Sequence, residues 1–154
     1  MKNITLPIRF ALAITGSLIG YFLILALFGL HTNPFFSLFN GVISGFGIYE
    51  AIKYYKLHLG DKFEYSDGFR VGVITGFVAT ILFTIFFGLY SSSVEPDFVE
   101  ELLTSFKLSY STGLGIVLFV VAIMGFATSL VLTLSFMQLF KDSWNTKRAK
   151  NKVS

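Results

Sequence analysis

The chain has no cysteine, only three prolines and only two histidines among its 154 residues. Without cysteine it forms no disulfide, has no thiolate nucleophile and offers no sulfur ligand to a metal. Charge is also scarce, because 14% of the residues are charged whereas 54% are apolar. Soluble domains carry about 25% charged residues, so this composition indicates a membrane protein.

Charged residues are missing altogether from three long stretches, residues 10–49, 71–94 and 108–140. A helix needs about 20 apolar residues to cross the ~30 Å hydrocarbon layer of a bilayer. The first stretch is long enough for two crossings and each of the others for one. We therefore predict an all-α integral membrane four-helix bundle, with spans near residues 7–30, 35–55, 68–90 and 113–140.

The same pattern predicts one transmembrane domain over residues 1–140 and a basic cytoplasmic tail over residues 141–154. The residues from His31 to Pro34 favour a tight turn, which makes the first two spans antiparallel neighbours. Ser66 or Asp67 is the expected N-cap of the third span, because both side chains can accept a bond from a free backbone N–H group.

A different kind of helix is predicted between the third and fourth spans, around residues 97–107. Its apolar residues recur at the spacing of one helical face, and its charged residues occupy the rest of the surface. The apolar set is Phe98, Val99, Leu102, Leu103 and Phe106, and the charged set is Asp97, Glu100, Glu101 and Lys107. This segment is too short and too charged to span, so we expect it to lie on the membrane surface or to cap the bundle.

The basic residues are segregated by side. With four spans, every Lys and Arg except Lys107 falls on the side that carries both termini. Cytoplasmic loops of membrane proteins carry the excess of Lys and Arg, so both termini are expected in the cytoplasm. The predicted location is the bacterial inner (cytoplasmic) membrane.

Small residues four positions apart occur in every span. The predicted helix-packing residues are Gly16, Gly20, Gly41, Gly45, Gly72 and Gly76, and Gly68, Gly125 and Ser129 extend the pattern. Lipid tails give helices no hydrophobic reason to associate, so close contact over small residues drives their packing. Such faces serve packing within one chain or self-association; we expect the first use before the second.

No catalytic, cofactor-binding or metal-binding residue is predicted. The topology separates His31 from His58, so the two cannot share a metal, and Asp61, Glu64 and Asp67 read as a solvated loop with a helix cap. Glu50 is expected to pair with Lys53 one turn away. An enzyme acting on lipid would have one candidate cluster, which consists of Glu50, His58, Asp61 and Arg70. We predict a non-enzymatic protein.

Two short patterns flank the third span. Tyr65, Gly68, Phe69 and Gly72 form an aromatic-x-x-small-Phe-x-x-Gly pattern, and Pro96, Asp97 and Phe98 follow the span. In both respects the chain resembles a bacterial membrane-protein family catalogued as domain of unknown function 4199, although that family more often has Phe at the place of Tyr65. The resemblance implies a four-span protein of about this size and no assigned activity.

The sequence therefore favours a subunit or accessory of a larger membrane assembly, without cofactors. The expected partners are the lipid bilayer and a membrane-protein partner or a homo-oligomer, with no nucleic acid. The alternative is a small-solute transporter or channel, which needs a polar path between helices. The side chains available to line such a path are Asn40, Ser44, Thr75, Thr80, Thr84 and Gln138.

Overall fold

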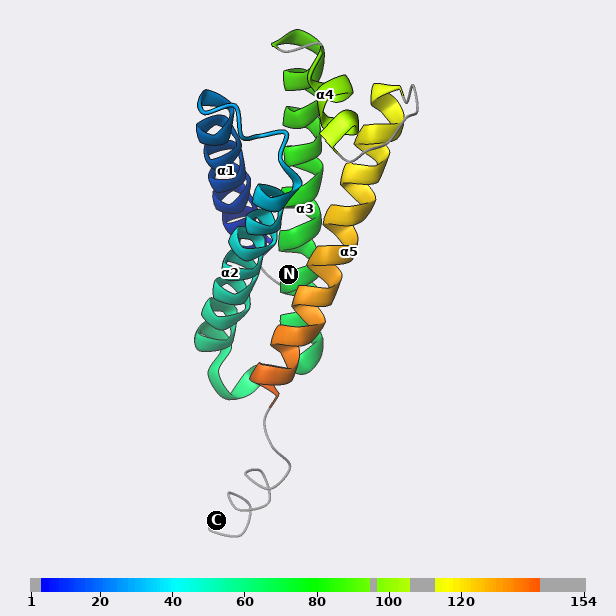
Figure 1. The fold of residues 1–154 in the computed structure, drawn as a ribbon. Coiled ribbons are helices and arrows are strands. Elements are labelled where there is room, and N and C mark those ends of the chain that lie inside the picture. The colour runs from blue at the N-terminus through cyan, green and yellow to red at the C-terminus, as the bar shows by residue number, and fades with distance from the viewer. Residues whose placement is uncertain (1–3, 95–96, 106–112, 142–154) are drawn as a thin grey trace, which may run out of the picture.

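The computed structural model describes residues 4–94, 97–105 and 113–141, and its regular structure in these ranges is helical. The elements are α1 (Thr5–Leu27), α2 (Pro34–Leu59), the short 3-10 helix η1 (Gly60–Lys62), α3 (Tyr65–Ser93), α4 (Phe98–Ser105) and α5 (Leu114–Phe140). Four long helices pack together and α4 lies between α3 and α5 in the chain, which confirms the predicted architecture (Figure 1). The predicted tail beyond Lys141, and Phe106 and Lys107 of the predicted amphipathic helix, lie outside the described residues.

The turn between α1 and α2 is built by its own local bonds. Gly29 has a positive φ of 67°, the left-handed conformation that glycine adopts without a Cβ penalty. The N–H groups of Leu30 and Gly29 donate to the carbonyls of Leu25 and Ala26, at 2.9 and 3.0 Å, as in a Schellman C-cap. Three residues later Asn33 caps α2, because its Oδ1 accepts from the N–H of Phe35 at 3.0 Å.

The expected N-cap of the third span was wrong by two or three residues. The structure starts α3 at Tyr65 and makes Glu64 the N-cap residue, so that Ser66 and Asp67 lie inside the first turn. Asp67 still caps the helix from there, because its Oδ2 accepts from the N–H of Glu64 at 3.3 Å. An acidic side chain in the first turn also complements the positive end of the helix dipole.

Helix α3 is the centre of the bundle and contacts the other three long helices, with α1 and α5 on opposite flanks (Figure 1). Its longest interface is with α5. There small residues of α3 meet small or slender residues of the antiparallel α5 at every fourth position. We call this interface the α3–α5 seam; its facing pairs are Gly68–Met137, Gly72–Thr133, Gly76–Ser129 and Thr80–Gly125.

The seam is tight because glycine lets two backbones approach closely. A Cβ added to Gly72 would lie 2.5 Å from Cγ2 of Thr133, and one added to Gly125 would lie 2.5 Å from Cγ2 of Thr80. Real Cβ atoms essentially never come so near. The hydroxyl of Thr133 donates to the carbonyl of Ser129 at 2.7 Å, so this fully buried polar group is satisfied within its own helix.

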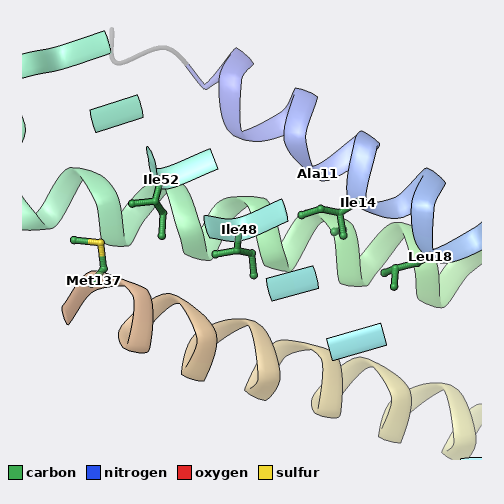
Figure 2. Packing of buried hydrophobic residues seen from close by; sticks show 7 residues of the cluster. Ala11, Ile14, Leu18, Ile48, Ile52 and Met137 are labelled. Atoms are coloured by element: carbon green, nitrogen blue, oxygen red, sulfur yellow. The ribbon is translucent and has the colours of Figure 1, made fainter. Parts of the chain in front are cut away.

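Beside the seam, apolar side chains of α1 and α2 complete the core near its middle. Ala11, Ile14 and Leu18 lie along one face of α1, where they point toward the other helices (Figure 2). Ile48 and Ile52 of α2 join them and are fully buried. Ile14 of α1 packs over Gly47 of α2, a glycine that was not among the predicted packing residues.

The outer surface of the bundle carries many large apolar side chains. Large hydrophobic side chains are exposed on every long helix, among them Leu12, Ile24, Phe46, Ile81, Ile85, Phe119, Met124 and Leu139. A surface of this kind would be costly in water, whereas lipid tails solvate it. Each of the four long helices has the length and hydropathy to cross a membrane.

Candidate functional site

The predicted packing glycines fall into two groups. Gly45, Gly72 and Gly76 lie against other helices of the bundle: Gly45 against Leu132 and Phe136 of α5, and the other two in the α3–α5 seam. Around Gly16, Gly20 and Gly41, by contrast, an added Cβ would meet nothing within 4 Å. The second group therefore makes no close helix contact within the described chain, and its use in packing stays a prediction.

The polar residues that could line a transport path are dispersed. The hydroxyl of Thr75 is fully buried and donates to the carbonyl of Pro7 in α1 at 3.4 Å. Thr80 belongs to the α3–α5 seam, and Gln138 is exposed on the outside of α5, away from any interior path. Among the described residues, Oδ1 of Asn40 and Oγ1 of Thr84 are buried without a hydrogen-bond partner.

The one candidate cluster for lipid chemistry is spread over three elements. Glu50 lies on α2 and pairs with Lys53, at 3.1 Å between Oε1 and Nζ, as the sequence indicates. His58 at the end of α2, Asp61 in η1 and Arg70 on α3 are all exposed. Within the described ranges no group of three His, Asp or Glu residues could hold a metal ion.

One end of the bundle is closed by aromatic rings. We call it the aromatic end; its rings are Phe22, His31, Phe83, Phe86, Phe87, Tyr90 and Phe98. Phe22 of α1 lies at the centre of this group, with the Tyr90 and Phe86 rings edge-on at centroid distances of 5.0 and 5.8 Å. Edge-to-face pairs of this kind add about 0.5–1.5 kcal/mol each beyond the area that they bury.

Helix α4 is attached to the aromatic end through Phe98. The Phe98 ring is fully buried and stacks on the imidazole of His31 at 4.9 Å between centroids, with the planes 9° apart. It also meets Phe87 at 5.4 Å and Phe22 at 5.8 Å. Glu100 and Glu101 of α4 remain exposed, so the amphipathic helix caps the bundle with its apolar face inward.

The opposite end, where α2 and α5 terminate, is closed by cations and rings together. We call it the basic end; its central residues are Tyr49, Lys53, Lys56, Phe63, Phe136 and Phe140. Lys56 Nζ donates to the carbonyl of Phe140 at 2.9 Å, and lies 5.5 Å from the Phe63 ring and 5.9 Å from the Phe140 ring. A cation at a helix C-terminus satisfies a free carbonyl and complements the helix dipole, so α2 caps α5.

Capping of the bundle by the amphipathic helix is one of the two placements that the sequence predicts, whereas the ring cluster beneath α4 and the cap from Lys56 to α5 were not predicted. The spacing of Phe83, Phe86, Phe87 and Tyr90 places them on one helical face, and this was the available signal for the aromatic end. The bond from Lys56 to Phe140 joins residues 84 positions apart, and nothing local in the sequence indicates it. The predicted separation of the histidines is confirmed, because His31 lies at the aromatic end and His58 beyond the other.

Four long apolar helices with a lipid-compatible surface define a multi-pass membrane protein with four candidate spans. The chain belongs to the family described as Protein of unknown function (DUF4199), whose match covers residues 9–108. This confirms the resemblance seen around the third span. The matched region covers most of α1 and all of α2, α3 and α4, but it does not reach α5. No curated protein and no solved structure matches the chain.

Proposed function

We propose that this protein is a non-enzymatic subunit or accessory of a larger membrane assembly. The observation that supports the proposal is that some glycines of the long helices contact other helices of the chain and others do not. The α3–α5 seam uses its glycines within the chain, whereas Gly16, Gly20 and Gly41 on α1 and α2 face open space. Small residues on an outer helix face let a second helix approach closely and pack well, whereas contact with lipid tails does not require small residues there.

Crosslinking in native membranes, followed by mass spectrometry of what is captured, tests this proposal. We expect a membrane-protein partner or a second copy of the chain, and expect Gly16→Leu with Gly20→Leu to abolish its capture. Val131→Leu is the control, because this residue of α5 is 61% exposed and already carries a side chain, so the variant adds bulk to an outer helix face without filling the space beside a glycine. A monomer without partners in native mass spectrometry would contradict the proposal.

The proposed orientation has both termini in the cytoplasm of a bacterial cell, within the inner membrane, because the basic end carries the Lys and Arg excess. The absence of cysteine makes this simple to test. A single cysteine at Lys62 in η1 should be protected from an impermeant thiol reagent in intact cells, whereas one at Glu100 in α4 should react. The reverse labelling pattern would overturn the orientation.

A small-solute transporter or channel is the second candidate. It is favoured by Oδ1 of Asn40 and Oγ1 of Thr84, whose burial without a partner costs about 1–3 kcal/mol each unless water or a solute supplies the bond. Proteoliposomes should then shrink and recover in a glycerol gradient, or pass K⁺, faster than empty vesicles. Asn40→Leu with Thr84→Val should abolish the flux, and equal rates in protein-free vesicles would dismiss this candidate.

A further inference from the structure

The ends of α2 and α5 form a polar and apolar surface that the proposed role in an assembly does not use. Tyr49 of α2 packs against Phe136 and Phe140 of α5, at centroid distances of 5.5 and 5.3 Å. Lys53 and Lys56 follow one and two turns after Tyr49, and they lie on the same face of α2. The ends of α2 and α5 therefore lie side by side. Their aromatic rings lie nearer the middle of the bundle, and the lysine ammonium groups lie nearer its basic end.

The two lysines are held in place and yet reach solvent. Lys56 is anchored by the carbonyl of Phe140 and by the faces of two phenyl rings. Lys53 contacts Glu50 and lies 5.7 Å from the Tyr49 ring centroid, while its side chain is 45% exposed. Lys141, directly after the last residue of α5, is exposed as well. Lys53, Lys56 and Lys141 thus bring three cations to the neighbouring ends of α2 and α5, and Glu50 pairs with Lys53.

The wall toward the middle of the membrane is apolar. Phe46 precedes Tyr49 by one turn on the same face of α2 and is 69% exposed. From Phe46 through Tyr49 to Lys53 the surface changes from purely apolar to aromatic to cationic. A phospholipid has the same order of groups, from acyl chain through the interface to the phosphate. Basic pockets between spans at this level of the membrane bind anionic head groups.

We propose that the basic end carries a binding site for an anionic phospholipid, with its phosphate between Lys53, Lys56 and Lys141 and an acyl chain along Phe46 and Tyr49. A soluble anion would use the cations alone, whereas an anionic lipid can also cover the apolar wall with an acyl chain. The site does not depend on whether the chain joins an assembly, because none of the outward-facing glycines takes part in it.

Lipid retention by the purified full-length chain in native mass spectrometry measures the site. We expect the chain to retain phosphatidylglycerol and to lose phosphatidylcholine at the same activation energy. Each lysine near a membrane surface contributes about a fivefold increase in the affinity for anionic lipid, so Lys53→Gln should reduce retention by about that factor. Adding Lys141→Gln should reduce it by a similar factor again.

Arg9→Gln is the matched control, since it removes one exposed positive charge from α1, which lies across α3 from α5. It should leave phosphatidylglycerol retention within twofold of the wild type. Equal losses from Arg9→Gln and Lys53→Gln would show a diffuse electrostatic effect and overturn the site, as would equal retention of both lipids. Protection from thermal unfolding by glycerol 3-phosphate equal to that by phosphatidylglycerol would overturn a lipid as the occupant.

Discussion

The aromatic end and the basic end differ in what holds them closed. At the aromatic end, α4 is attached by the Phe98 ring, which is completely buried among rings from α1, α3 and the α1–α2 turn. At the basic end, α2 is tied to α5 by the half-buried Lys56 ammonium, through one directed bond and two ring faces. Burial of an uncharged ring is not weakened by ionic screening, whereas the interactions of a partly hydrated ammonium are weakened by salt and respond to nearby anions.

The largest effect is expected when the aromatic end loses its anchor. Phe98→Ala removes a completely buried ring and leaves a cavity, so it should reduce the free energy of unfolding by about 3 kcal/mol or more. Thermal unfolding in detergent measures the loss, and limited proteolysis should show earlier cleavage around α4. Phe35→Ala is the control, because that ring is 63% exposed. If both variants lose stability equally, Phe98 is not the anchor.

A smaller effect is expected at the basic end. Lys56→Met keeps most of the side-chain volume but removes the donor to the Phe140 carbonyl and the charge over two rings. The expected loss is about 1–3 kcal/mol in the free energy of unfolding. Lys62→Met in η1, where the side chain is exposed, should cost much less. A Lys56→Met protein as stable as the wild type would mean that α5 needs no cap from α2.

Two substitutions of His31 test how much its ring stacking on Phe98 contributes to stability, apart from the polar properties of histidine. His31→Phe keeps an aromatic face and should retain most of the stability of α4 attachment. His31→Ala removes the face and should cost about 1 kcal/mol in the free energy of unfolding. The two variants are compared by thermal unfolding at one pH. If they behave alike, the stacking geometry contributes nothing measurable.

The smallest effect is expected from the ion pair between Lys53 and Glu50. Its side chains are 45% and 30% exposed, and pairs of this kind contribute about 0–1 kcal/mol. In detergent without anionic lipid, Glu50→Gln should therefore change the unfolding temperature by little. Raising the salt concentration should reduce even that difference. A large loss would show that the pair is structural, and the basic end would then resemble the aromatic end.

The spans could be predicted from the sequence because a long uncharged segment in lipid must pair its own backbone N–H and C=O groups, and a helix does this within one segment. It predicted the helix boundaries less well: α2 continues to Leu59, four residues beyond the expected end, since Gly60 with its positive φ is what stops it. Likewise Glu64, rather than Ser66 or Asp67, occupies the N-cap position of α3.

The same limit applies to the glycine patterns. Gly16 and Gly20 have the same four-residue spacing as Gly72 and Gly76, yet only the second pair meets another helix of the chain. Spacing shows that two residues share a face but not what the face meets. What each glycine face meets depends on how all four helices are arranged. This arrangement depends in turn on contacts between residues far apart in sequence, such as Lys56 with Phe140 and His31 with Phe98.

The α3–α5 seam has a consequence for how α3 and α5 find their alignment. Its small residues repeat every four positions on both helices, so a slide by four residues, about 6 Å, would again set small residues against each other. In that shifted alignment Gly72 would face Ser129, and Gly76 would face Gly125. The repeat by itself therefore does not distinguish these two alignments of α3 and α5. Contacts outside the repeat distinguish the two alignments, because such a slide would carry the Phe140 carbonyl away from Lys56 of α2 and the Phe126 ring away from Phe77 of α3.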